Sequence, residues 1–292
     1  MNAMTSTNLE AVVDPVLTGT GEKRAIPTSL GRLAVYDTGA PARPTASSKV
    51  LVLWPSILAD HRIYSEQVAA LRERHRLILI DGPGHGASGA PAGGFSMADC
   101  ARAQLQVLDA LAVTEPVITI GTSWGGLVAG EFALAYPDRT CGVVMFNTPV
   151  FTSSARGRDR FVTFGSRWLK GTNVFVKGVA ESYFMPSTRE RERGFMADFS
   201  QHIKSANGAA MSRAVRSVLL EREDLASRLS GIAAPTLFVA GTNDPMCPVA
   251  EQRDAAARLP RGRFVELPTA HIAVVDAPTD STLAIERFLE RL

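Results

Sequence analysis

The sequence predicts an α/β fold built on a mostly parallel, doubly wound sheet. Short apolar runs of strand length recur along the chain, and segments with helical periodicity separate them. Runs that are apolar on both faces are typical of parallel strands that helices cover from two sides. The regular alternation of strand and helix indicates that the sheet is doubly wound. One long interruption of this rhythm predicts an insertion.

The first two strands are expected within residues 24–37, on either side of Leu30 and Gly31. Glycine after a short extended run suits the tight turn of a hairpin. Later apolar runs predict the rest of the sheet, at residues 50–53, 77–80, 117–120, 143–146, 236–240 and 263–267. The helices are expected at residues 63–72, 97–111, 127–136, 249–259 and 282–292.

The interruption follows the sixth predicted strand. It is too long for a loop, and much of it is compatible with helix. We therefore expect a helical cap at residues 152–230 and a core formed by residues 23–151 and 231–292. Residues 1–22 are weakly patterned and rich in Thr, Ser and Gly, so they are expected to form a loose N-terminal arm.

The composition is that of an ordinary soluble protein, with 292 residues, 46% of them hydrophobic and 21% charged. The formal net charge of +2 does not suggest a nucleic acid or another polyanion as partner. The cysteines, Cys100, Cys141 and Cys247, are sparse and have no short repeated spacing. This pattern argues against a disulfide framework and against a zinc site, so we expect no structural metal.

Two absences in the sequence bear on localisation. The first fifteen residues lack the basic start and the apolar run of a secretory signal. No stretch approaches the roughly 20 apolar residues that a membrane-spanning helix needs. We expect a cytoplasmic protein with a small-molecule partner and without nucleic-acid or membrane partners. The sequence leaves the oligomeric state open.

A Gly-x-Ser-x-Gly sequence centred on Ser123 lies between the run at 117–120 and the helix predicted at 127–136. In this context a sharp turn holds the serine in a strained conformation and lifts its Oγ above the sheet edge. Gly121 and Gly125 avoid side chains that would clash in so tight a turn. The helix directs the positive end of its dipole at the site. Ser123 is therefore the candidate nucleophile, and the alternative is an ordinary tight turn.

A serine hydroxyl is a weak nucleophile and needs a base. The chain has histidines at positions 61, 75, 85, 202 and 271. His271 follows the last predicted strand, and the chain order nucleophile, acid, histidine that accompanies this kind of turn requires a C-terminal histidine. We therefore predict that His271 is the general base, against the alternative of a histidine in a surface loop.

The acid that orients the histidine is expected at the end of the preceding strand, where Asp244 follows the run at 236–240. An aspartate there accepts a hydrogen bond from the imidazole and stabilises the imidazolium. Asp276, five residues beyond His271, is a weaker alternative. The strand before carries Asn147 at its end instead of an acid. Asp244 could also be a turn-forming residue before a proline.

Two further motifs resemble those of the α/β-hydrolase superfamily. Residues 81–88, DGPGHGAS, look like its D-x-x-G-x-G-x-S turn. That turn has a structural role, so the resemblance does not assign His85 to catalysis. Residues 270–278, AHIAVVDAP, resemble the C-terminal motif of the 3-oxoadipate enol-lactonase and related esterase branch. The resemblance covers the core from about Arg24 to Leu292 and implies the α/β-hydrolase fold with an esterase or lactonase activity.

The same resemblance suggests where an oxyanion hole is formed. Many members carry His-Gly after the first core strand, whereas this chain has Trp-Pro-Ser-Ile at residues 54–57. Residues 60–67 resemble the segment that follows in the enol-lactonase branch, and counting back from it places Ile57 just after the usual pair. The implied donors are the backbone N–H groups of Ile57 and Trp124, with Ser56 as the alternative to Ile57. The proline has no N–H and is excluded.

The reaction that the resemblance implies is acyl transfer to water through an acyl-enzyme, with no metal or organic cofactor. A cofactor-free perhydrolase or haloperoxidase, or an acyltransferase, would use the same triad with another acceptor. A haloalkane dehalogenase would need a carboxylate where Ser123 stands. A non-catalytic binding protein is a further alternative because fold alone does not fix function, although it would be expected to have lost a triad member.

The charge of the expected cap suggests a class of substrate. Residues 152–222 contain 13 Lys and Arg against 6 Asp and Glu, an excess of seven positive charges in a chain of net charge +2. Arg213 and Arg216 could share one face of a helix, and an excess of one sign near a cleft concentrates substrates of opposite charge. This leads to the hypothesis that the ester or lactone carries a carboxylate. The alternating charges of residues 189–193 are typical of a solvated surface.

Overall fold

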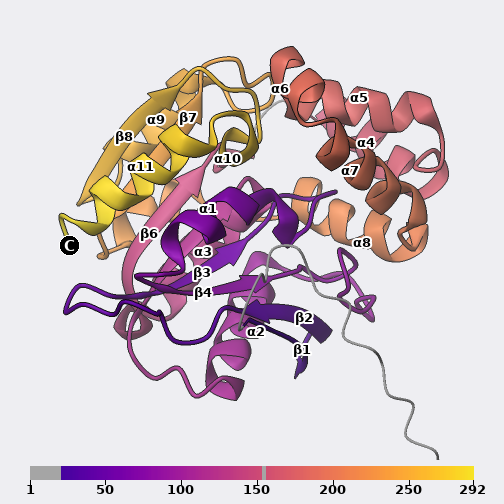
Figure 1. The fold of residues 1–292 in the computed structure, drawn as a ribbon. Helices are drawn as coiled ribbons and strands as arrows, with labels where there is room; N and C mark the ends of the chain where they lie inside the picture. Colours follow the sequence, from indigo (N-terminus) through magenta and orange to yellow (C-terminus); the bar gives the residue numbers. More distant parts are fainter. Residues whose placement is uncertain (1–20, 153–155) are drawn as a thin grey trace, which may run out of the picture.

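The computed structural model describes residues 21–152 and 156–292. In this part of the chain the strands form one sheet, in the order β1-β2-β4-β3-β5-β6-β7-β8 (Figure 1). The strands are β1 (Glu22–Thr28), β2 (Gly31–Asp37), β3 (Val50–Trp54), β4 (Arg76–Ile80), β5 (Val117–Thr122), β6 (Thr140–Phe146), β7 (Thr236–Gly241) and β8 (Gly262–Leu267). Strands β3 to β8 pair in parallel, whereas β1 and β2 form an antiparallel hairpin beside β4. The predicted mostly parallel sheet is therefore confirmed.

Each run predicted as a strand lies in this sheet. The turn of the hairpin ends at Gly31, whose φ of +96° suits glycine. Every residue of β3, β5 and β7 is buried, as expected for strands with helices on both faces. The arm predicted for residues 1–22 lies almost wholly outside the described residues, and β1 begins at its last residue, Glu22.

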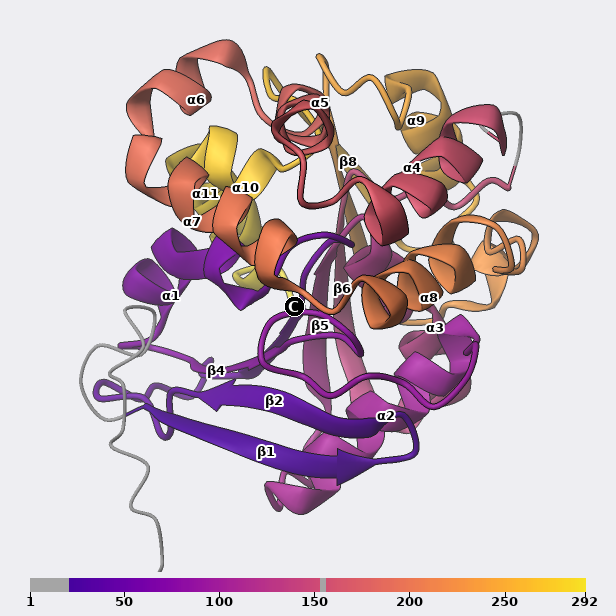
Figure 2. The ribbon, with the colours of Figure 1, turned by 90° about the vertical axis from the view of Figure 1, so that its right-hand side faces the viewer.

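Helices cover both faces of the sheet (Figure 2). One face carries η2 (His61–Tyr64), α1 (Ser65–Leu71), α10 (Ala273–Asp276) and α11 (Pro278–Leu289). The other carries α2 (Met97–Ala110), α3 (Trp124–Ala135) and α9 (Val249–Ala257), with the short η3 (Pro137–Arg139) after α3. The residues of α3 from Trp124 to Ala133 are all buried. The helix that follows Ser123 is therefore held in the centre of the molecule.

A group of helices, called the cap helices below, lies between β6 and β7, which confirms the helical insertion after the sixth strand. They are α4 (Arg156–Trp168), α5 (Asn173–Tyr183), α6 (Pro186–Arg191), α7 (Arg193–Ser205) and α8 (Gly208–Leu219), and η4 (Ala226–Gly231) leads back to β7. They gather at one side of the core in Figure 1. The domain boundaries at residues 152 and 230 stay a prediction. Within the described ranges, no helix combines the length and the apolar character that crossing a bilayer requires.

Candidate active site

Ser123 lies between β5 and α3, in a turn with an unusual backbone. Its φ is 56° and its ψ is −108°, a region that residues other than glycine rarely adopt because it is sterically strained. A Cβ on Gly121 would lie 1.9 Å from the carbonyl carbon of Gly125, and a Cβ on Gly125 would lie 1.8 Å from the carbonyl oxygen of Trp54. The close approach of the backbone segments therefore requires both glycines of the motif.

Backbone hydrogen bonds hold this turn against two neighbouring strands. The N–H of Ser123 donates to the carbonyl of Phe146 at 2.8 Å, and the N–H of Gly125 donates to the carbonyl of Pro55 at 3.1 Å. The N–H of Trp124 has no such partner among the described residues. It lies at the first turn of α3, where the helix dipole favours negative charge. The role of this N–H group as an oxyanion donor stays a prediction.

The loop after β3 lies beside the same turn. The hydroxyl of Tyr64 bonds the carbonyl of Trp54 at 2.9 Å and the hydroxyl of Thr122 at 3.0 Å, so it ties the end of β3 to the end of β5. Ser56 and Ile57 are buried, and in the described ranges their backbone N–H groups have no hydrogen-bond partner. Ile57 and its alternative Ser56 therefore stay predictions for the second oxyanion donor.

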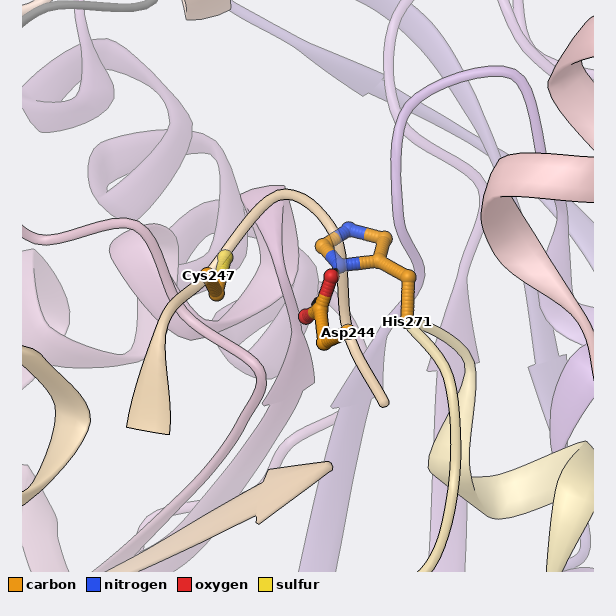
Figure 3. Close-up of side chains that lie close together, drawn as sticks. All are labelled: Asp244, Cys247 and His271. Atoms are coloured by element: carbon orange, nitrogen blue, oxygen red, sulfur yellow. Dashed lines mark hydrogen bonds and ion pairs between the residues drawn. The ribbon is translucent and has the colours of Figure 1, made fainter. Parts of the chain in front are cut away.

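His271 and Asp244 come together beyond the ends of β8 and β7 (Figure 3). The imidazole Nδ1 and the Asp244 Oδ2 are 2.8 Å apart, and both side chains are buried. Because β5, β7 and β8 belong to the parallel part of the sheet, Ser123, Asp244 and His271 all follow carboxyl ends at one edge. A carboxylate at Nδ1 leaves Nε2 to act on a nucleophile, which is the arrangement that a general base needs.

Asp244 accepts two further hydrogen bonds, from Asn147 Nδ2 to Oδ2 at 2.7 Å and from the N–H of Met246 to Oδ1 at 2.8 Å. Burial opposes its ionisation, but the charge of His271 and the hydrogen bonds outweigh burial and hold the pKa of Asp244 below its usual value. Asn147 Nδ2 also donates to the carbonyl of Ala270 at 3.2 Å. The sequence analysis noted Asn147 only as a strand end without an acid. In the structure its side-chain amide joins the loop of Asp244 to the loop that carries His271.

Asp276, the alternative acid, binds backbone groups instead of an imidazole. Its Oδ2 accepts from the N–H of Ala270 at 2.8 Å, and its Oδ1 accepts from the N–H of Met185 at 3.0 Å. Burial raises the pKa of Asp276 above its usual value, whereas that of Asp244 is lowered. The carboxylate of Asp276 therefore fastens the loop of His271 to the segment that follows α5.

Tyr183, the last residue of α5, connects the cap helices to both sides of the site. Its hydroxyl donates to the carbonyl of Ile57 at 2.9 Å, and its ring centroid is 5.3 Å from that of His271. Its own carbonyl accepts from the N–H of Ile272 at 3.0 Å. No motif marks Tyr183, because its contacts depend on how the chain folds back: Ile57 is 126 residues away in sequence.

The other four histidines have structural partners, and the Nδ1 of His75 accepts from the N–H of Lys49 at 3.2 Å. His61 Nδ1 lies 3.0 Å from Asp81, and His202 Nδ1 lies 3.2 Å from Asp60. His85 is buried, and its Nδ1 lies 3.2 Å from the carbonyl of the residue two positions before it. This agrees with the structural role that the resemblance implied for the turn at residues 81–88.

We expect His85 to make the folded protein less stable in mild acid. Burial lowers its pKa to about 4, whereas an unfolded histidine has a pKa of about 6.5. Below about pH 6.5 the unfolded chain therefore binds a proton that the folded chain does not. The free energy of unfolding should fall between about pH 6.5 and pH 4, by up to about 3 kcal/mol from this residue.

Urea titrations at several pH values in this window measure the effect. The variant His85→Gln keeps a hydrogen-bonding side chain but has no titrating group, so its free energy of unfolding should vary less with pH than that of the wild type. The same pH dependence in both proteins would contradict the assignment.

Asp244, Cys247 and His271 form the only group of three potential metal ligands in the described part of the chain, with one ligand atom from each within 4.8 Å of the others (Figure 3). Cys247 Sγ lies 3.2 Å from the carbonyl of Asn147, and Asp244 and His271 bond each other. Each ligand atom already contacts a protein group. The arrangement therefore fits a hydrogen-bonded pair of aspartate and histidine better than a metal centre. In a metal centre the ligand atoms of Asp244 and His271 would face the ion instead of each other.

The two cap arginines behind the hypothesis of an anionic substrate have partners in the protein. Arg213 donates to the carbonyl of Pro91, and Arg216 pairs with Glu221 at 2.6 Å. The charge of the substrate stays a hypothesis. A groove of about 610 Å³ lies elsewhere, between β8 and α11, and none of the candidate site residues lines it.

Comparisons with known proteins agree with this fold. Residues 49–278 match the model of a family described as alpha/beta hydrolase fold. The chain is 24% identical over 246 residues to 3-oxoadipate enol-lactonase 2 of Acinetobacter baylyi, a match that covers 84% of this chain and 90% of the relative. The resemblance to the enol-lactonase branch that residues 270–278 predicted is confirmed.

Two further comparisons concern esterases. The chain is 27% identical over 239 residues to the pimeloyl-[acyl-carrier protein] methyl ester esterase of Xanthomonas oryzae pv. oryzae, with 78% of this chain and 89% of the relative covered. Its structure is similar to that of a thermophilic esterase from Thermogutta terrifontis, with a TM-score of 0.80, 25% identity, and 92% of this chain and 98% of that chain covered.

Proposed function

The chain belongs to the α/β-hydrolase fold family, and on this basis we propose that it is a serine hydrolase that cleaves a carboxylic ester or lactone of a small molecule. The observation that carries the proposal is the buried 2.8 Å contact between His271 and Asp244, at the sheet edge where Ser123 has its strained backbone. A tight turn with only a structural role would not need a buried pair of aspartate and histidine at the same edge of the sheet. The relatives named for a lactone and a methyl ester support the substrate class.

In the proposed mechanism, His271 takes the proton of Ser123 while Oγ attacks the carbonyl carbon. Asp244 holds the imidazole by its Nδ1–H and stabilises the imidazolium. The N–H groups of Trp124 and Ile57, with Ser56 as the alternative to Ile57, stabilise the oxyanion, an effect of about 3–4 kcal/mol for each donor. His271 then protonates the leaving alcohol, and an acyl-enzyme remains. A water molecule activated by His271 releases the acid.

A fluorophosphonate probe followed by peptide mass spectrometry tests the proposal. The expected result is one adduct on the peptide that contains Ser123, together with release of free acid from a panel of esters and lactones. The absence of both the adduct and turnover would favour a non-catalytic binding protein. Product analysis with added peroxide or alcohol decides the acceptor, because a perhydrolase would give the peracid and an acyltransferase a new ester in preference to free acid.

We expect the variant Tyr183→Phe to lower kcat about fivefold, since it removes the hydrogen bond to the carbonyl of Ile57, worth about 1 kcal/mol, from the segment that carries the proposed oxyanion donor. KM should change much less, and the affinity for a boronic acid that mimics the tetrahedral intermediate should fall in proportion to kcat. Tyr183→Ala should lose more, because it also removes the ring that lies against His271.

The control for this prediction is Tyr136→Phe, which removes a hydroxyl at the end of α3. Unchanged kcat and boronate affinity in Tyr183→Phe would show that Tyr183 only supports the fold. A rise in KM without a change in kcat would instead give Tyr183 a role in substrate binding.

A further inference from the structure

Helix α4 exposes a row of large aromatic side chains. Phe161, Phe164 and Trp168 have 60%, 55% and 63% of their surface exposed. Spacings of three and seven residues place them on one face of the helix. Single exposed apolar residues are ordinary, but several exposed aromatic side chains on one helix face indicate a surface that binds a partner molecule or a membrane.

Other residues of α4 pack closely against its neighbours. Gly165 is so close to α5 that a Cβ there would lie 2.3 Å from the ring of Phe175. The hydroxyl of Ser212 on α8 donates to the carbonyl of Thr163 at 3.0 Å. Figure 2 shows α4 and α8 side by side. Helix α4 is therefore held in place by α5 and α8, while its three large aromatic side chains stay exposed.

Positive charge flanks the aromatic row. Arg160 and Arg167 are exposed, and each directly precedes an aromatic residue of the row. The guanidinium of Arg167 lies 4.8 Å from the centre of the Trp168 ring. Neither arginine pairs with a carboxylate in the described part of the chain. The acid of this helix, Asp159, is buried, so the exposed face of α4 is apolar and cationic.

We propose that this α4 face, defined as Arg160, Phe161, Phe164, Arg167 and Trp168, docks the protein on an anionic lipid surface. Aromatic side chains that enter the boundary between headgroups and acyl chains, with arginines at the same level, are the features of helices that lie in a membrane interface. The arginines add attraction to anionic headgroups. This kind of contact needs no spanning segment, so it departs from the sequence expectation of no membrane partner.

A second copy of the chain fits this face less well. In a two-fold dimer the same face meets itself, which would bring the arginines of both copies together without an acid between them. Juxtaposed like charges oppose such an interface. An anionic lipid surface satisfies both the aromatic and the cationic part of the α4 face.

Binding to vesicles tests the proposal and requires no catalysis, so it is independent of the proposed function. The probes are vesicles of phosphatidylcholine alone and vesicles that also contain phosphatidylglycerol. Trp54 and Trp124 are 1% and 0% exposed, so a change in tryptophan emission reports mainly on Trp168. We expect flotation with the anionic vesicles at low salt, a blue shift of the emission, and loss of both at high salt.

The double variants Phe161→Ser/Phe164→Ser and Arg160→Gln/Arg167→Gln should each weaken binding about tenfold or more. The matched control is Leu283→Ser on α11, an apolar residue that is 38% exposed and lies outside this face. Turnover of a water-soluble ester should be unchanged in all three. No binding by the wild type, equal binding by the variants, or a dimer that Phe161→Ser/Phe164→Ser dissociates would each overturn the proposal.

Discussion

Replacement of Ser123 by alanine is expected to reduce ester turnover by about 10⁶-fold, because the members of a catalytic triad act as a unit and alanine has no nucleophile. The residual rate would come from substrate binding and the oxyanion donors alone. The fold should not change, since the variant loses a single hydroxyl and the turn is held by backbone bonds to Phe146 and Pro55. Steady-state kinetics of the purified variant, with circular dichroism as the folding check, measure both parts.

A matched control is Ser65→Ala, which removes a hydroxyl from the start of α1 and should leave turnover unchanged. Fluorophosphonate labelling should disappear in Ser123→Ala and persist in Ser65→Ala. Turnover within about tenfold of the wild type in Ser123→Ala would refute Ser123 as the nucleophile.

The second large effect is expected at Asp244. The variant Asp244→Asn keeps the size of the side chain but cannot hold the imidazole in the required tautomer, so kcat should fall by about 10⁴-fold. Asp276→Asn should cost far less, because its oxygens accept from the N–H groups of Ala270 and Met185 and reach the chemistry only through the position of the loop. Measurement of kcat for both variants on the same ester gives the comparison. The opposite order of severity would make Asp276 the acid.

The core of the fold follows from local sequence patterns, whereas the packing of the cap helices does not. Strands such as β3 and β5 are apolar on both faces, so their burial can be inferred from a few consecutive residues. The positions of Ser123, Asp244 and His271 follow equally well, because each lies just after a predictable strand and parallel strands end at a common edge. The helices between β6 and β7 could be predicted as helices, but their packing against the core could not.

The residues that sequence reasoning missed act through tertiary contacts. Tyr183 reaches Ile57 only because α5 ends over the loop that follows β3. Asn147 follows β6, at a position where an acid could have been. It donates a hydrogen bond to Asp244 only because the loops after β6 and β7 meet in the folded protein. Asp276, which the sequence analysis named as the alternative acid, lies close to His271 in sequence, yet its carboxylate accepts from the N–H groups of Ala270 and Met185. Spacing along the chain does not encode these directions.

The place where the cap helices join the sheet has an evolutionary consequence. The chain leaves the core after β6, and the carbonyl of Val150 accepts hydrogen bonds from the N–H groups of Leu225 and Ala226, where the chain comes back from the cap helices. The two ends of the insertion are therefore held close together, so the insertion can lengthen, shorten or change its sequence at little cost in chain entropy. Ser123 and His271 lie outside it. Proteins that descend from one ancestral core can therefore acquire new substrates by a change in the cap helices, while the residues at the carboxyl ends of the strands stay the same.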